Sequence, residues 1–113
     1  DLSTDTVYSL VKGIDASYGD FKGTAPGVDG WHKSRQNFQW VVPWHSGAIK
    51  FWKEIGVWSS AAQTHNDGLL KRQGVLAATW KKYKASPEGD FQAGWMKARA
   101  AGLKAAGMPV IFN

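Results

Sequence analysis

Three histidines are the residues of this chain best suited to acid–base or metal chemistry, but their spacing favours neither. His32, His45 and His65 lie far apart, and none has the partner four residues away that a helical zinc site needs. The carboxylates are scattered, without the aromatic-flanked pair of a glycosidase cleft. No cysteine is present, which excludes thiol chemistry and disulfides. We therefore predict that the chain is not an enzyme and has no catalytic residue, no metal and no cofactor.

Tryptophan is the other residue type that suggests a binding function. The chain has seven: Trp31, Trp40, Trp44, Trp52, Trp58, Trp80 and Trp95. Trp52, Trp80 and Trp95 fall on apolar helical stripes, so we expect them in a core or an interface. The other four lie within residues 41–58 or just before them, where a ring can line a cleft. Carbohydrate binding is therefore an alternative, which the exposure of these rings decides.

Positive charge raises the question of a nucleic-acid partner. The chain has 14 Lys and Arg against 9 Asp and Glu, a formal net charge of +5. Most of these cations are spread along two expected helices: Lys71, Arg72, Lys81, Lys82, Lys84, Lys97, Arg99 and Lys104. Because they form no dense run and no recognised motif, we expect solvated helix faces and no nucleic acid. A basic nucleic-acid binder, with steeply salt-dependent affinity, remains a further alternative.

Residues 41–58, VVPWHSGAIKFWKEIGVW, contain the most specific pattern of the chain. Pro43 suits the start of a helix, Ser46 is the expected N-cap, and Gly56 can end the helix in a left-handed conformation. A helix of about three turns is marginal alone and must dock on a larger body. The segment therefore predicts a short amphipathic helix built into such a body.

The start of this helix holds the candidate ligand-binding residues Trp44, His45 and Gly47. His45 lies where free backbone N–H groups and the helix dipole attract an anion such as a carboxylate. The alternative is a structural histidine that hydrogen-bonds the backbone and fixes the turn before Gly47. Both interpretations are open from the sequence.

The spacing of apolar residues predicts a mainly α chain of about four helices. We expect them over residues 4–18, 46–55, 59–84 and 90–107, with the break SPEG at 86–89 making a hairpin of the last two. Residues 37–42 alternate, which predicts either a short strand paired with chain outside this sequence or extended coil. The apolar tail, Pro109 to Phe112, is expected to dock. The predicted division is into residues 1–58 and 59–113.

The segment at 43–56 resembles the signature P-x-H-P-G-A-I-x-Y-x-K-E-x-G of TAXI-type solute-binding proteins, the extracytoplasmic receptors of TRAP transporters. Ser46 stands in place of the second proline of the signature, and serine still suits a helix start. The preceding V-Y-x-L-x-K helix of the family is resembled by Asp5, Val7, Tyr8, Leu10, Val11, Lys12 and Ile14. The extended tail of some members is resembled by His65, Asn66, Leu69, Leu70, Arg72, Gln73, Val75, Leu76, Trp80, Trp95, Arg99, Gly107, Met108 and Pro109.

This resemblance covers nearly the whole chain but corresponds to only the last third of such a receptor. It implies part of a two-lobed α/β fold of the periplasmic-binding-protein type II kind, which closes on a small organic solute, often a carboxylate or an amino acid. The implied partners are the remainder of the receptor chain, the solute and the TRAP membrane permease subunits, and the implied location is the periplasm. In such receptors the ligand is gripped largely by residues upstream of this segment.

A free-standing helical protein-interaction module is the alternative from a different class. A receptor fragment is expected to expose a large apolar patch where the rest of the receptor belongs, whereas a module closes its core and leaves residues 38–42 unpaired. The sequence opens DLSTDTV, with no initiator methionine and no leader, so we expect a processed product or the trailing part of a longer chain. No apolar run has the roughly 18 residues that span a bilayer.

Overall fold

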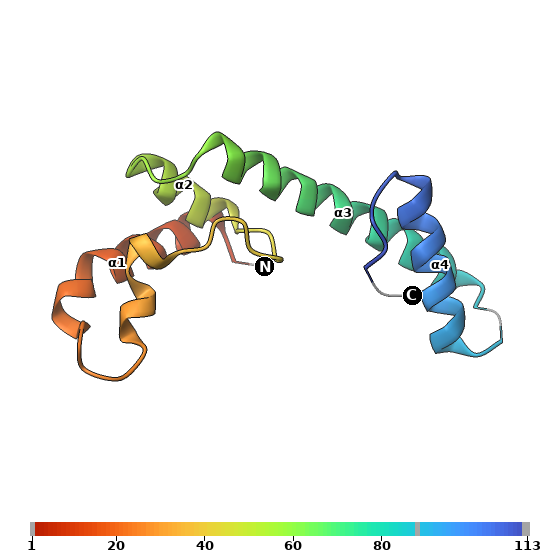
Figure 1. Cartoon of the computed structure of the whole chain (residues 1–113), viewed down its shortest axis with the longest axis horizontal. Helices are drawn as coiled ribbons and strands as arrows, with labels where there is room; N and C mark the ends of the chain where they lie inside the picture. Colours follow the sequence, from red (N-terminus) through yellow and green to blue (C-terminus); the bar gives the residue numbers. More distant parts are fainter. Residues whose placement is uncertain (1, 88, 112–113) are drawn as a thin grey trace. The chain divides into compact units, whose positions relative to one another are not determined.

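The computed structural model describes residues 2–87 and 89–111, and every regular element within these ranges is a helix (Figure 1). The α-helices are α1 (Thr4–Phe21), α2 (Ser46–Glu54), α3 (Ser60–Ala85) and α4 (Phe91–Ala105), and the 3₁₀ helices are η1 (Val28–Trp31) and η2 (Lys33–Arg35). The predicted mainly α class with four helices is confirmed for these residues. None of the described helices combines the length and the apolar character needed to cross a membrane.

The chain divides into two compact units, unit 1 (residues 1–66) and unit 2 (residues 67–113), which are described separately below. The sequence predicts a division after residue 58, whereas the units separate after residue 66. Unit 1 extends further because the first turns of α3 bind it. The Asn66 side-chain oxygen accepts a 2.7 Å hydrogen bond from the Trp44 backbone N–H, and His65 Nε2 donates to the Trp40 carbonyl oxygen over 2.8 Å.

The short strand considered for residues 37–42 is not formed. Phe38 and Gln39 lie in a turn, in which the Asn37 side chain accepts the Gln39 N–H over 3.0 Å. Of the alternating apolar residues only Phe38 packs against the core, while Trp40 and Val42 are more than half exposed. Side chains, rather than a partner strand, bind the Gln39 N–H and the Trp40 carbonyl oxygen.

Helix α1 begins where expected and ends later than expected. The Ser3 hydroxyl accepts the Thr6 N–H over 3.1 Å, which is an N-cap interaction. The predicted end at residue 18 is wrong, because the helix continues through Gly19 to Phe21. The Phe21 ring packs edge-on against Tyr18 at 5.5 Å, and this contact stabilises the extra turn.

Helix α2 ends in the predicted left-handed glycine. Gly56 has φ +73°, a conformation that a side chain disfavours. The Val57 and Gly56 N–H groups donate to the carbonyl oxygens of Trp52 (3.0 Å) and Lys53 (3.1 Å), so the helix closes with a Schellman motif.

Helices α3 and α4 begin one residue after the predicted starts, each behind a side-chain cap. Ser59 accepts the Ala62 N–H over 3.1 Å at the start of α3, and Asp90 accepts the Ala93 N–H over 2.7 Å at the start of α4. Gly107, with φ +67°, follows the end of α4. The Tyr83 hydroxyl donates to the Phe91 carbonyl oxygen over 2.8 Å across the hairpin turn, of which Glu88 lies outside the described residues.

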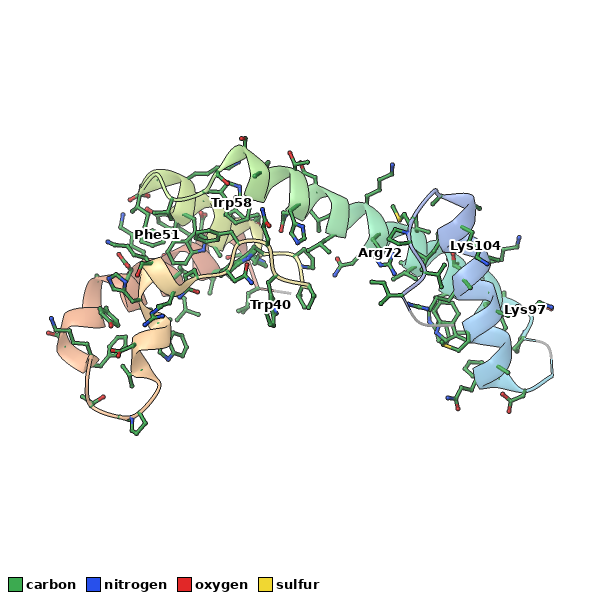
Figure 2. The ribbon with its side chains drawn as sticks, in the orientation of Figure 1. Trp40, Phe51, Trp58, Arg72, Lys97 and Lys104 are labelled. Carbon is green, nitrogen blue, oxygen red and sulfur yellow. The ribbon has the colours of Figure 1, made fainter. Side chains whose placement is uncertain are left out.

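The core of unit 1 is aromatic and centres on α2, where Ala48, Phe51 and Trp52 are buried. Phe38 packs against Trp52 and against Trp58 with ring centroids 5.6 and 5.4 Å apart. Figure 2 shows Phe51 and Trp58 among the side chains gathered around this helix. This core holds α2 in the larger body that the sequence requires.

Unit 2 has a smaller core, in which Tyr83 and Leu103 are buried. The Trp80 and Trp95 rings of α3 and α4 meet at 4.9 Å. Arg72 fixes the tail by donating a 2.8 Å hydrogen bond to the Pro109 carbonyl oxygen. Docking of the apolar tail is therefore seen only in part, because Ile111 is 67% exposed and Phe112 lies outside the described residues.

Candidate functional site

The two segments that carry the family resemblance in unit 1, on α1 and on α2, pack directly against each other. The Thr4 and Ser46 hydroxyls share a 2.7 Å hydrogen bond at one end of the contact. The Tyr8 ring meets the Phe51 ring edge-on at 6.4 Å further along. Residues separated by about 40 positions in the sequence therefore form one surface, and the candidate site residues lie at its start.

Gly47 is the point of closest approach between the two helices. A Cβ atom at this position would lie 2.3 Å from the Thr4 carbonyl oxygen and 2.7 Å from the Tyr8 backbone nitrogen. Real Cβ atoms do not approach backbone so closely, so only glycine fits here. Gly47 is buried, and its contacts are with α1.

His45, rather than Ser46, is the N-cap of α2. Its Nδ1 accepts the Gly47 N–H over 3.1 Å, and its Nε2 donates to the Leu2 carbonyl oxygen over 3.2 Å. The prediction that Ser46 is the cap is wrong because an imidazole nitrogen one residue earlier reaches the free N–H. Both nitrogens of His45 are thus engaged within unit 1, although its side chain is exposed.

Trp44 lies half-buried in the aromatic cluster. Its ring contacts Phe38 and Trp52 at centroid distances of 5.5 and 6.0 Å. Asn66, only 1% exposed, accepts the Trp44 backbone N–H. The indole N–H groups of Trp44 and Trp52 and the amide nitrogen of Asn66 are buried and have no hydrogen-bond acceptor among the described residues. These three donors are the polar feature of the core that the sequence pattern does not reveal.

Comparison with known proteins adds no relative. No protein-family model matches the chain, and no curated protein or solved structure is similar to it. The resemblance to TAXI-type receptors therefore rests on the residues quoted above, and the interpretation of Trp44, His45 and Gly47 as ligand-binding residues stays a prediction.

A polar network that the sequence reasoning missed joins α1 to α2 on the protein surface. The Tyr8 hydroxyl donates to Glu54 Oε2, and Lys12 Nζ donates to Glu54 Oε1 over 2.7 Å and to the Tyr8 hydroxyl over 2.9 Å. We call these three residues the Tyr8 network. Tyr8 and Lys12 are four residues apart and therefore lie on one helix face, which is the available sequence signal. The sequence does not indicate their partner, because Glu54 is distant along the chain.

The Tyr8 network shifts the pKa values of its charged members. The hydrogen bond to Lys12, followed by the one from Tyr8, lowers the pKa of Glu54. The hydrogen bonds to Glu54 and Tyr8 raise the pKa of Lys12. Tyrosine and lysine can transfer protons in an enclosed site, but Lys12 and Glu54 are about half exposed, so solvent screens the pair. The Tyr8 network therefore links α1 to α2.

Lys50 adds a second link across the same contact. Its ammonium lies 4.6 Å from the centre of the Tyr8 ring and 3.0 Å from Asp5 Oδ1. The carboxylate is highly exposed, so the ion pair contributes little and the cation–π contact provides the orientation. The Tyr8 ring is therefore enclosed by Phe51 and Lys50, while its hydroxyl is held by Glu54.

The other two histidines are engaged locally. His32 shares a 2.6 Å hydrogen bond with the Ser34 hydroxyl and packs on the Tyr18 ring at 4.9 Å. His65 donates to the Trp40 carbonyl oxygen. No group of three or more His, Asp or Glu side chains suited to a metal ion occurs among residues 2–87 and 89–111.

Trp31 and Trp40 are the tryptophans most open to a carbohydrate, at 57% and 56% exposed. In the part of the chain that the structure describes, neither ring packs against another aromatic ring. Trp58 is half-buried, and its indole N–H donates to Gln63 over 3.0 Å. The exposed pair therefore lacks the stacked or coplanar arrangement that a sugar platform uses.

Proposed function

We propose that this chain is the C-terminal part of an extracytoplasmic solute receptor of the TAXI type, acting in the periplasm with TRAP permease subunits. The solute is a small organic molecule, a carboxylate or an amino acid. The observation that carries the proposal is that the two resembling segments form one contact through their own motif residues. Beside α1, only glycine fits at position 47. Tyr8 and Lys12 of the first motif bind Glu54 of the second.

A second face of α1 supports the need for further chain. Val7, Tyr8 and Val11 pack against the unit 1 core, whereas Leu10 and Ile14 line a shallow depression of about 370 Å³ on another side of the helix. Leu10 is 56% exposed there. A helix with apolar residues on two sides is typical of an element covered on both. In the proposed receptor the remainder of the chain covers this depression.

Trp40, Val41 and Val42 also support a covering partner. They are consecutive, apolar and 56–74% exposed. Single exposed apolar residues are normal on a protein surface, but a contiguous group of large ones marks an interaction site. We assign this group to a contact with receptor chain beyond this sequence.

In this proposal Trp44, His45 and Gly47 act on the solute indirectly. His45 caps α2, Gly47 lets α2 approach α1, and Trp44 fills the core beside Asn66. The solute is held largely by chain upstream of these residues, and its binding stabilises the closed state through its higher affinity for that state. We therefore expect their substitution to lower receptor stability more than solute selectivity.

A free-standing helical interaction module is the second candidate, and one observation favours it. Residues 37–42 form no strand, and within the described residues Val41 and Val42 have no hydrogen bond to a neighbouring segment. The core of unit 1 is nevertheless closed by its own aromatic rings. In this candidate the group Trp40–Val42 binds another protein.

The DNA upstream of the codon for Asp1 separates the two candidates. An open frame that continues into two α/β lobes behind a signal peptide supports the receptor. In that case the complete protein, titrated with a panel of small carboxylates and amino acids, is expected to melt at a higher temperature with its solute. A start codon with a ribosome-binding site at this position contradicts the receptor proposal.

A further inference from the structure

A groove with basic edges lies between α3 and α4 in unit 2. It encloses about 780 Å³ and is open to solvent along the helices. Its α4 side consists of the small residues Gly94, Ala98, Ala101 and Ala105, which recur every three or four positions and so share one helix face. Its lining also includes two lysines, Lys82 of α3 and Lys97 of α4. We call this small-residue stripe the floor of the groove, and it lets another element approach α4 closely.

The charge of unit 2 matches these edges. Residues 67–113 contain eight cations (Lys71, Arg72, Lys81, Lys82, Lys84, Lys97, Arg99 and Lys104) and three anions (Asp67, Glu88 and Asp90). Unit 1 contains six of each sign, so unit 2 accounts for the whole net charge of +5. Lys82 and Lys97 are exposed, and neither pairs with a carboxylate of the described residues. The groove therefore presents two available cations.

The hydroxyl groups of the groove identify the kind of occupant. Thr79 donates to the Val75 carbonyl oxygen over 2.8 Å, and Tyr83 donates to the Phe91 carbonyl oxygen over 2.8 Å. Both of these donors are therefore used within the unit, and the third hydroxyl of the lining, that of Ser86, is exposed at the end of α3. The α4 side offers the methyl groups of Ala98, Ala101 and Ala105, which suit an apolar surface better than a polar solute.

We propose that this groove binds an amphipathic helix of a partner protein, with small or apolar residues on the buried stripe and Asp or Glu beside it. The methyl floor takes the apolar stripe, and Lys82 and Lys97 pair with the flanking carboxylates. A second copy of the chain is disfavoured because two basic units repel each other. Two cations beside a methyl floor also contrast with the many phosphate contacts of a nucleic-acid site. This inference does not rest on the receptor proposal.

The test uses the full chain and two labelled helical peptides of about 20 residues, long enough to form a helix on binding. Both have Leu and Ala on the stripe, one with Glu and the other with Lys at the flanking positions. In fluorescence anisotropy at low salt we expect the Glu peptide to bind at least tenfold more tightly than the Lys peptide. The double substitution Lys82→Glu and Lys97→Glu is expected to weaken binding of the Glu peptide about tenfold.

A matched control places the same charge change on the same helix away from the groove. Lys81→Glu with Lys84→Glu alters two residues that do not line it, and we expect less than a twofold change. Ala101→Trp fills the exposed floor and is expected to abolish peptide binding while circular dichroism shows an unchanged helix content. Lys82→Gln with Lys97→Gln, expected to weaken binding about threefold, serves if the double Glu variant fails to fold.

Three results overturn the proposal. The first is equal affinity for the Glu and Lys peptides, and the second is equal loss in the groove and control variants. The third is that neither peptide binds while a duplex DNA probe does, and that the double variant Lys82→Glu with Lys97→Glu no longer binds the DNA. This result assigns the groove to nucleic acid.

Discussion

At residue 47 the backbone of α1 leaves no space for a side chain. We expect Gly47→Ala to lower the free energy of unfolding by about 1–3 kcal/mol, because the clash is with rigid backbone. The helix propensity of alanine, worth up to about 1 kcal/mol, offsets part of this loss. Urea unfolding at neutral pH measures the difference. Gly13→Ala in α1 is the control. No atom lies within 4 Å of an added Cβ there, so the same gain in helix propensity is expected to stabilise the protein. Equal effects of the two substitutions contradict the close approach.

His45 tests the capping role directly. His45→Ala removes the acceptor of the Gly47 N–H, and we expect a loss of about 0.5–2 kcal/mol of unfolding free energy. His45→Asn restores a good capping acceptor and is expected to recover most of this loss. Thermal unfolding of the two variants gives the comparison. If Asn is as harmful as Ala, the histidine acts through something other than the cap.

The Tyr8 network predicts a pH window of stability. The pKa of Glu54 is lowered by folding, so its contribution is present above the ordinary value of 4.5 and is lost as the pH falls through the folded value. The pKa of Lys12 is raised, so its contribution is present below 10.5 and is lost as the pH rises through the folded value. Melting temperatures of the wild type and Glu54→Gln are expected to differ most between these limits and to converge at acid pH. A constant difference at every pH contradicts the network.

At the scale of elements, the sequence predicts helix ends well where a side chain caps them locally. Ser3, Ser59 and Asp90 are such caps, and Gly56 and Gly107 are the matching ends. These signals involve residues within a few positions of each other, so a linear pattern contains them. Of the two alternatives for residues 37–42, the strand is not formed, and one partner of this backbone, His65, lies 25 positions away, where a linear pattern does not show it.

The exposed face of α1 belongs to this scale. In the chain alone we expect Leu10→Ser to change the unfolding free energy by less than about 0.5 kcal/mol, because Leu10 is already mostly exposed. In the longer receptor that we propose, the same substitution is expected to cost about 1–3 kcal/mol, because the proposal has further chain covering this face. Urea unfolding of both proteins measures the two values. An equally small effect in the longer protein argues that this face stays uncovered.

At the scale of the whole molecule, composition predicts a basic chain but not where the charge lies. The division after residue 66 separates a neutral unit from one with the entire net charge, and that division depends on Asn66 and His65 binding unit 1. The candidate site likewise depends on contacts that only the folded chain makes. Trp44, His45 and Gly47 were found from a motif, whereas the Thr4 backbone became the neighbour of Gly47, and Glu54 the partner of Tyr8 and Lys12, only through folding.

The distribution of indole rings has a consequence for observing this chain. Trp44, Trp52 and Trp58 share one cluster with Phe38 in unit 1, while Trp80 and Trp95 meet edge-on in unit 2. Closely spaced rings held at fixed angles couple their electronic transitions, so we expect each cluster to have its own near-ultraviolet dichroism. Replacing Trp80 and Trp95 by phenylalanine is expected to leave the tryptophan signal of unit 1 alone. The chain thus contains two intrinsic optical reporters, with which the melting of either half can be followed without an added dye.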